Sequence, residues 1–233
     1  MIIIGHRGVA GRFPENTFSS INAAIELGLE WIEVDIQPTK DGILVVCHDH
    51  TVNRCSNGKG RVDELTLEEL RKLNFAHRFN SSMPPQTIMT LNELLCLADD
   101  RGIKLNLEVK VDKHDAHSVC QLLSKELLKL NVSTENILLS SFDHQVIREL
   151  HQQLPQFPLA VLTERLRKKD RALLKEVSAV GCNLNHVWTN QSQVESLKAD
   201  GYQVWCYTVN NPNRLKHLKN LDGLFSDFPE RFL

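Results

Sequence analysis

The chain has 233 residues, of which 42% are hydrophobic and 24% are charged, so it can bury a sizeable core. Its 27 Lys and Arg residues against 29 Asp and Glu residues leave a formal net charge of -2, and the like charges form no long block. This balance argues against a protein dedicated to nucleic acid or to a membrane surface.

Targeting and compartment signals are weak. No apolar run approaches the roughly 18 residues that a membrane-spanning helix requires. The first residues lack the basic leader, apolar run and cleavage site of a signal peptide. The six cysteines lie far apart and form no Cys-x-x-Cys pair, so we interpret them as reduced, mostly buried side chains. We therefore expect a cytoplasmic protein without a stable membrane anchor.

Short apolar runs and longer amphipathic segments alternate along the chain, which is the pattern of parallel sheets with crossover helices. The apolar runs predict eight strands, at residues 2–4, 31–36, 104–109, 136–141, 159–162, 181–184, 203–208 and 223–226. The amphipathic segments predict helices at residues 17–27, 91–98, 116–130, 144–153, 171–180, 192–200 and 212–218. Eight strand-helix units in a chain of this length approach the roughly 250 residues of a (β/α)8 barrel, so we expect this closed α/β fold, the TIM barrel.

The second predicted strand is followed by Asp41-Gly42 and then by another apolar run, at residues 43–49. An Asp-Gly pair between two apolar runs is typical of a hairpin, and so short a connection cannot cross over to a parallel strand. We therefore expect residues 43–49 to run antiparallel along the second strand. A two-residue turn at Asp41-Gly42 would set Asp35 opposite His48.

A stretch rich in Asn, Ser, Gly and Pro runs from residue 51 to residue 89 and includes one weak helix, at residues 66–73. It interrupts the alternation of strands and helices. We expect a single barrel domain of residues 1–233, in which residues 51–89 form an insertion that covers one end of the barrel.

Carboxylates stand at strand ends where apolar side chains are expected, at Glu33, Asp35 and Glu108. Residues i and i+2 of a strand point to the same side, so Glu33 and Asp35 share a face. If that face is the barrel interior, all three carboxylates converge at the carboxyl end, where such barrels hold their active sites. A hard divalent cation would relieve their repulsion, and an all-oxygen ligand set suits Mg or Ca rather than zinc.

Two histidines and two cations accompany these carboxylates. His48 would stand beside the metal if it lay opposite Asp35, and His6 ends the neighbouring first strand. Imidazole titrates near neutral pH and suits acid and base roles, while Arg7 and Lys110 could hold phosphate oxygens. Any one of the carboxylates alone would be interpreted as part of a salt bridge, and the other histidines as surface or packing residues. The combined set indicates hydrolysis of a phosphate ester.

These residues belong to short motifs that follow one another along the chain. The motifs are His6-Arg7-Gly8, Pro14-Glu15-Asn16-Thr17, Glu33-Val34-Asp35, His48-Asp49, Glu108-Val109-Lys110, Ser141-Phe142, Trp205 with Thr208-Val209-Asn210, and Asp222-Gly223 with Asp227-Phe228-Pro229. Together they resemble the glycerophosphodiester phosphodiesterases, particularly the compact bacterial cytoplasmic type. The resemblance implies a (β/α)8 barrel with a small insertion after the His-Asp motif. It also implies hydrolysis of a glycerophosphodiester to sn-glycerol 3-phosphate and an alcohol such as choline or ethanolamine, a reaction of lipid and glycerol metabolism.

The resemblance also implies roles for the residues at the site. By the family's pattern, Glu33, Asp35 and Glu108 would bind one divalent cation, Mg or Ca depending on the member. His6 and His48 would be the acid-base pair.

Four further residues would contact the substrate by the same pattern. Arg7 and Lys110 would bind the phosphate, and Phe142 and Trp205 would border the substrate pocket. Asp227, near the end of the chain, could equally be structural and close the last strand.

Two other functions remain open. A related barrel could cleave lysophospholipids in the manner of a lysophospholipase D, and a broad exposed apolar rim around the site would favour it. A noncatalytic barrel could instead bind phosphorylated metabolites, and it would be expected to lack a histidine or a carboxylate, whereas this chain has them all. We expect a small-molecule substrate and no nucleic-acid partner, and the sequence predicts no oligomeric state.

Overall fold

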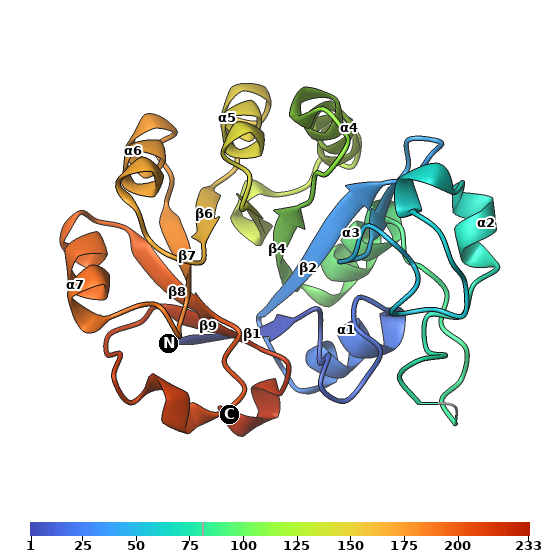
Figure 1. Ribbon diagram of the computed structural model, residues 1–233, viewed down its shortest axis with the longest axis horizontal. Coiled ribbons are helices and arrows are strands. Elements are labelled where there is room, and N and C mark those ends of the chain that lie inside the picture. Colours follow the sequence, from blue (N-terminus) through green and yellow to red (C-terminus); the bar gives the residue numbers. More distant parts are fainter. Residues whose placement is uncertain (81) are drawn as a thin grey trace.

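The computed structural model describes residues 1–80 and 82–233, and its centre is a closed barrel of eight parallel strands (Figure 1). These strands are β1 (Ile2–His6), β2 (Trp31–Pro38), β4 (Lys104–Val109), β5 (Ile137–Ser141), β6 (Leu159–Thr163), β7 (Gly181–Asn185), β8 (Gln203–Tyr207) and β9 (Gly223–Ser226). The ring closes because β1 pairs in parallel with both β2 and β9. The predicted (β/α)8 barrel is confirmed.

Helices lie outside the ring, and α4 to α7 form an arc around strands β4 to β8 (Figure 1). The helices of the barrel are α1 (Phe18–Glu26), α3 (Leu91–Arg101), α4 (Ala116–Lys129), α5 (His144–Gln153), α6 (Lys168–Glu176) and α7 (Gln191–Ala199). Most begin at a side chain that accepts a hydrogen bond from the first turn, as Thr17 does for α1 and Thr90 for α3. Within the described residues, no helix is both long and apolar enough to span a membrane.

The predicted helix at residues 212–218 is wrong. The chain forms only a 3-10 turn there, η3 (Pro212–Leu215), which begins at Asn211. The segment offers only Leu215 and Leu218 as large apolar side chains, which is too little burial to hold a short helix.

The alternation of side chains along each strand separates two apolar cores. Ile32 and Val34 of β2 point outward and join the large core between the strands and the helices. A smaller cluster fills the barrel interior, and its buried members are Ile4, Leu138, Ala160, Trp205 and Phe225. Glu33 and Asp35 alternate with Ile32 and Val34, so the packing of β2 against the helices directs both carboxylates into the barrel.

A short ninth strand, β3 (Leu44–Val46), runs antiparallel to β2 as predicted, but its register differs from the prediction by one residue. Asp35 lies opposite Cys47, whose N–H donates to the Asp35 carbonyl at 2.9 Å, and not opposite His48. The expected cross-strand pair of Asp35 and His48 is therefore wrong.

The reason for the shift is the length of the turn. The Thr39 N–H donates to the Ile43 carbonyl at 2.9 Å, so three residues form the loop between them. Gly42 closes this loop in the left-handed region, at a φ of 76°. A three-residue loop that ends in a left-handed glycine is a common hairpin connection, and an Asp-Gly pair is compatible with both loop lengths.

β2 is long enough to pair with two strands in succession along one edge. Its residues 31–33 pair with β1, and its residues 36–38 pair with β3. Its other edge pairs with β4 over residues 31–36. As a result, the chain that leaves β3 enters the carboxyl end of the barrel next to the loop that follows β1.

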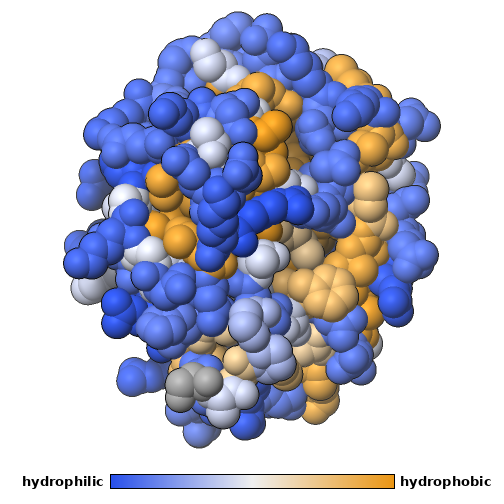
Figure 2. All heavy atoms as spheres, turned by 90° about the vertical axis from the view of Figure 1, so that its right-hand side faces the viewer, coloured by the Kyte–Doolittle hydropathy of each residue, from blue (hydrophilic) through white to orange (hydrophobic). Residues whose placement is uncertain are grey.

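The described part of the segment 51–89 lies beside β2 and α3, on the right of Figure 1. It contains the 3-10 turn η1 (Val62–Glu64) and the short helix α2 (Leu67–Arg71). Its apolar side chains form a separate small core on Val45 and Cys47 of the hairpin, with Val52, Val62, Leu70, Phe75 and Ile88 among its buried members. On this side of the molecule hydrophilic side chains cover much of the surface, with hydrophobic atoms in patches between them (Figure 2).

Candidate active site

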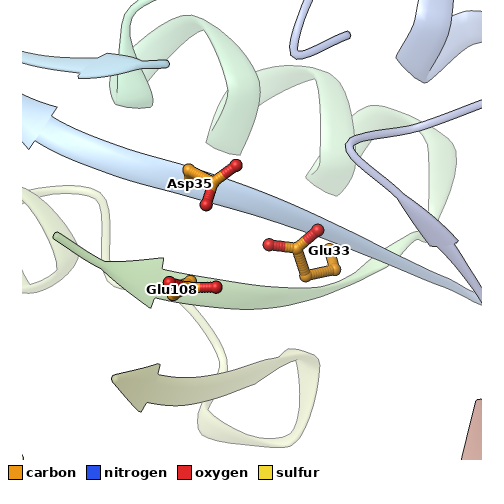
Figure 3. Close-up of side chains that lie close together, drawn as sticks. All are labelled: Glu33, Asp35 and Glu108. Carbon is orange, nitrogen blue, oxygen red and sulfur yellow. The ribbon is translucent and has the colours of Figure 1, made fainter. Parts of the chain in front are cut away.

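Three carboxylates meet inside the carboxyl end of the barrel, Glu33 and Asp35 from β2 and Glu108 from β4 (Figure 3). One oxygen of each lies within 4.8 Å of the others, and all three side chains are buried. Asp35 and Glu108 are direct neighbours across the two paired strands. The structure thus brings together the carboxylates that the sequence singles out.

The carboxylates carry more negative charge than the site neutralises on its own. Burial, together with the charges of Asp35 and Glu108, raises the pKa of Glu33 to about 8. Burial and Asp35 likewise raise the pKa of Glu108. Glu33 Oε1 is also buried without a hydrogen-bond partner among the described residues. A cluster of oxygen donors with an unsatisfied buried oxygen and a raised carboxyl pKa fits a hard divalent cation such as Mg or Ca.

Two cationic side chains flank these carboxylates. Lys110 Nζ lies 2.7 Å from Glu108 Oε1 and 3.1 Å from Asp35 Oδ1, and Arg7 Nε lies 3.2 Å from Asp35 Oδ2. Burial raises the pKa of an acid such as Asp35, but the charges of Lys110, Arg7 and His48 and the hydrogen bond from Asn16 together hold this pKa well below its usual range. Asp35 is therefore the ionised centre of the group, while Glu33 holds a proton more readily.

The loop after β1 fixes the backbone of Arg7. Arg7 has a left-handed φ of 53°, and its N–H donates to Glu33 Oε2 at 3.1 Å. Gly8 follows with a φ of 83°, and a Cβ there would lie 2.4 Å from the Ser20 carbonyl oxygen. Only glycine fits between this turn and α1, because any side chain would meet the helix backbone.

His6 is held by a carboxylate from the other end of the chain. Its Nδ1 lies 2.6 Å from Asp227 Oδ1, and its Nε2 lies 3.8 Å from Glu33 Oε2. Burial raises the pKa of an acid such as Asp227, but the hydrogen bond and charge of His6, the hydrogen bond from Asn210 and the charge of Arg7 together outweigh it, and the net pKa is lowered. Because an ionised carboxylate only accepts hydrogen bonds, the Nδ1 of His6 carries the proton and its Nε2 is left for the site.

His48 reaches the same cavity despite the shifted register. The side-chain amide of Gln37 donates to the carbonyls of Cys47 and Asp49, both at 2.8 Å, and holds the chain that leaves β3. His48 Nδ1 lies 2.7 Å from Asp49 Oδ1, so this imidazole is also oriented by a carboxylate. The expected position of His48 at the site is therefore reached by a turn after the strand rather than by strand pairing.

The two histidines differ in their pKa shifts. Burial lowers the pKa of His6, but Glu33 and Asp227 outweigh burial and raise it above the ordinary imidazole value. Burial also lowers the pKa of His48, and the opposing charge of Asp35 does not reverse that. At a pH between two such pKa values, one imidazole is protonated and the other is neutral, so one can donate a proton while the other accepts one.

Most of these groups, though not Asp35, line a cavity of about 190 Å³ that opens at the carboxyl end of the barrel. Its polar lining is His6, Arg7, Glu33, His48, Asn106, Glu108, Lys110 and Thr208, and its apolar or aromatic lining is Phe142, Leu162, Tyr207 and Phe225. Phe142 and Tyr207 pack edge to face, with ring centroids 5.7 Å apart. The cavity thus has a charged side from β1, β2 and β4 and an aromatic side around β5, β6, β8 and β9.

Trp205, expected at the border of the pocket, is not among the residues that line this cavity. It is buried in the barrel interior, with its ring centroid 5.4 Å from that of Trp31 and 5.7 Å from that of Phe225. Tyr207 lies two residues further along β8 on the same face and lines the cavity instead. The expected residue, Trp205, lies on the correct face of β8 but too close to the amino end of the strand to line the cavity.

Several residues of the site were given no role in it from the sequence, although Asn16 and Asp227 belong to its motifs. Asp227 follows β9 at the same end of the barrel as the other polar residues, and this position could have indicated it. Asn16 donates from Nδ2 to Asp35 Oδ2 at 3.0 Å. Arg54 bonds the carboxylates of Glu15 and Asp49. No sequence signal marked Arg54, because it reaches the site from the irregular segment 51–89.

Known proteins agree with this fold. Residues 6–231 match the Glycerophosphoryl diester phosphodiesterase family. A glycerophosphodiester phosphodiesterase from Bacillus altitudinis is 33% identical over 234 residues, which cover 98% of this chain and 95% of the relative. One from Caldanaerobacter subterraneus subsp. tengcongensis is 30% identical, with coverage of 100% and 96%.

A solved structure gives the same result. A phosphodiesterase from Oleispira antarctica, in complex with the product sn-glycerol-3-phosphate, superposes with a TM-score of 0.88 at 26% identity, over 99% of this chain and 94% of that chain. The fold and the site define a TIM-barrel hydrolase. The chain belongs to the glycerophosphoryl diester phosphodiesterase family.

Proposed function

We propose that the protein uses a divalent cation, Mg or Ca, to hydrolyse glycerophosphodiesters such as glycerophosphocholine or glycerophosphoethanolamine. The products are sn-glycerol 3-phosphate and the alcohol. One observation carries the proposal: three carboxylates cluster at one cavity, and two of them line it together with two carboxylate-bound histidines and two cations. The product bound to the Oleispira antarctica phosphodiesterase supports the same substrate class.

The cation would be held by Glu33, Asp35 and Glu108. When bound, it would polarise a phosphate oxygen and offset the charge of Glu33. Lys110 and Arg7 lie on either side of Asp35 and would hold phosphate oxygens by charge-assisted hydrogen bonds.

The two histidines would move the protons of the reaction. His6 would remove a proton at Nε2 from the attacking hydroxyl, either of water or of the substrate's own glycerol. His48 would protonate the leaving alcohol. The pKa directions in the metal-free protein are the reverse of these roles, since His6 is raised and His48 is lowered. The assignment therefore requires that, in the loaded enzyme, neutralising Glu33 lowers the pKa of His6 and that His48 is protonated when the substrate is bound.

The rest of the substrate would lie between Asn106 and the aromatic side of the cavity. Asn106 Oδ1 is buried without a partner among the described residues, and Asn106 lines the cavity, so it can accept from a glycerol hydroxyl. Phe142 and Tyr207 would border the alcohol group, in place of the expected pair of Phe142 and Trp205.

A second candidate is cleavage of lysophospholipids. Phe142, Val187 and Trp188 are large apolar side chains, 42%, 62% and 52% exposed, in loops that follow β5 and β7 at the carboxyl end of the barrel. Apolar surface at that end could take an acyl chain. We rank it second because Val187 and Trp188 do not line the cavity that holds the charged groups.

The organisation and the location of the protein are proposals of the same kind. We propose one domain of residues 1–233, with the segment 51–89 as an insertion. None of the described residues of this segment lines the cavity. We also propose a cytoplasmic location, which the six free cysteines favour because reduced thiols persist there.

The test is an assay of the purified protein with glycerophosphocholine and glycerophosphoethanolamine, in Mg, in Ca and in EDTA. Released sn-glycerol 3-phosphate is measured with a coupled dehydrogenase. We expect release that depends on the metal. If no metal supports release, the proposed substrate class is wrong, and release of choline from lysophosphatidylcholine then tests the second candidate.

A further inference from the structure

Arg54 is the only arginine of the described segment 51–89 whose guanidinium bonds two carboxylates that in turn hold residues of the cavity. On one side, its Nη1 and Nη2 donate to Glu15 at 2.6 and 2.7 Å. On the other side, its Nε and Nη2 donate to Asp49 at 2.7 and 2.9 Å. The planar guanidinium thus forms a two-bond contact with each carboxylate, a geometry that the single ammonium of lysine cannot reproduce.

Each of these carboxylates also holds a side chain that lines the cavity. Glu15 Oε1 accepts from Arg7 Nη1 at 2.8 Å. Asp49 Oδ1 lies 2.7 Å from His48 Nδ1. Arg54 itself does not line the cavity, so it can reach the reacting groups only through Glu15 and Asp49.

We propose that Arg54 is a positioning residue of the active site, which fixes Arg7 through Glu15 and His48 through Asp49. The inference rests on the proposed function, in which Arg7 holds the phosphate and His48 protonates the leaving alcohol. It also gives the segment 51–89 a role in the site: the segment supplies the group that ties the loop after β1 to the chain after β3.

The electrostatics of Asp49 agree with this role. The hydrogen bond from Arg54 is the main cause that lowers the pKa of Asp49 to about 2, and the bond to His48 adds to it. An ionised Asp49 can only accept a hydrogen bond, so it keeps a proton on Nδ1 of His48 and leaves Nε2 to take up the proton that His48 gives to the leaving alcohol. Without Arg54, Glu15 and Asp49 would lose their shared counter-ion and the contact that orients both.

The alternative is an ordinary surface ion pair, since half of the Arg54 side chain is exposed. Such pairs usually affect only stability, and only weakly. Arg148 on α5 is a matched control, because its guanidinium also forms a two-bond contact with a carboxylate, Glu176, at 2.7 and 3.0 Å. That pair lies on the outer helices, away from the cavity.

The kinetic test compares Arg54→Gln, Arg54→Lys and Arg148→Gln with the wild type, by kcat and KM for glycerophosphocholine and by thermal unfolding. We expect Arg54→Gln to lower kcat/KM at least 10-fold, with a rise in KM through Arg7 and a fall in kcat through His48. We expect Arg54→Lys to recover only part of this. Arg148→Gln should match Arg54→Gln in unfolding temperature but keep the activity of the wild type. Equal activity of the two Gln variants would overturn the proposal.

A mutant cycle tests whether Arg54 acts through its two carboxylates. In a Glu15→Gln, Asp49→Asn background, we expect adding Arg54→Gln to change kcat/KM less than 2-fold. A further 10-fold loss in that background would show that Arg54 acts by another route.

A measurement independent of turnover separates this inference from the proposed function. Long-range ¹H–¹⁵N NMR of the imidazole rings at a pH where His48 is neutral reports which nitrogen carries the proton. We expect the Nδ1–H form of His48 in the wild type and in Arg148→Gln, and a mixture of forms in Arg54→Gln. An unchanged His48 signal in Arg54→Gln would overturn the positioning role even if the enzyme is active. If the wild type does not hydrolyse glycerophosphocholine but the His48 signal still changes in Arg54→Gln, only the proposed function would be overturned.

Discussion

His6 Nδ1 lies 2.6 Å from Asp227 Oδ1, so the end of the first strand and the residue after the last strand form one histidine-carboxylate pair. Asp227 is itself fixed by Asn210, whose Nδ2 donates to Asp227 Oδ2 at 2.6 Å. Closure of the barrel therefore does more than bury a core. It orients the imidazole that would accept the proton in the proposed reaction.

Asp227→Asn should reduce kcat by roughly 10²-fold, the usual scale of positioned acid-base catalysis, because an amide no longer fixes the tautomer of His6. The matched control is Asp222→Asn, since Asp222 pairs with Lys198 just before β9, at the opposite end of the strand. Steady-state kinetics at saturating substrate and metal give kcat for both variants. An Asp227→Asn enzyme as active as the Asp222→Asn enzyme would contradict this role for Asp227.

The role of His48 can be separated from that of His6 by the leaving group. His48→Ala should lower kcat for glycerophosphocholine by about 10²-fold or more if it protonates the leaving alcohol. A 4-nitrophenyl phosphodiester of glycerol needs little protonation, because 4-nitrophenol is a good leaving group. We therefore expect His48→Ala to recover most activity on that substrate, whereas His6→Ala should stay slow on both. Recovery by His6→Ala instead of His48→Ala would reverse the two roles.

The pKa of Glu33 makes the stability of the metal-free protein depend on pH. Burial, with Asp35 and Glu108, raises this pKa to about 8 in the folded chain, against about 4.3 for glutamate in an unfolded chain. Between these values the folded form binds a proton that the unfolded form releases. The stabilisation is complete below about pH 4 and is lost as the pH rises through about 8.

We therefore expect the unfolding temperature in EDTA to fall by several degrees between pH 6 and pH 9, and to fall less in Glu33→Gln. Thermal unfolding followed by circular dichroism measures both. Saturating Mg or Ca should reduce the difference in the wild type, because a bound cation replaces the proton. The same pH dependence in the wild type and in Glu33→Gln would argue against a raised pKa at Glu33.

Much of this architecture could be predicted from local patterns. The strands of the barrel are short apolar runs, and alternation along β2 is enough to direct Glu33 and Asp35 to one side. The barrel rule that polar residues at carboxyl strand ends converge then brings Glu108 to them. These predictions succeed because they depend only on periodicity and on the parallel order of the strands.

The failures lie where distant segments decide the geometry. The hairpin register depends on a three-residue loop that Asp41-Gly42 does not specify, so Asp35 faces Cys47. Which aromatic residue of β8 lines the cavity depends on how far the strand extends toward it. Tyr207 lines the cavity, whereas Trp205 does not. The contacts of Arg54 depend on the fold of an irregular segment, for which periodicity gives no information.

A substitution at Gly8 tests whether the close contact between the loop after β1 and α1 restricts this position to glycine. Gly8→Ala would place a Cβ 2.4 Å from the Ser20 carbonyl oxygen at a φ of 83°, so we expect a loss of about 2 to 5 kcal/mol from steric overlap and backbone strain. Gly28→Ala is the control, because Gly28 has a φ of 73° with no atom within 4 Å of the added Cβ. It should cost about 1 kcal/mol. Urea unfolding measures both, and equal losses would show that the contact with α1 is not restrictive.

The most direct measurement is calorimetric titration of Mg and of Ca into the metal-free protein, with turnover of glycerophosphocholine assayed in parallel. The wild type should bind one cation per chain, and Glu108→Gln should bind it at least 10-fold more weakly with a matching loss of activity. Glu149→Gln, which alters a carboxylate on the outer helix α5, should behave as the wild type in both assays. Saturable binding and turnover that are unchanged in Glu108→Gln, or turnover that persists in EDTA, would contradict a cation centre built from Glu33, Asp35 and Glu108.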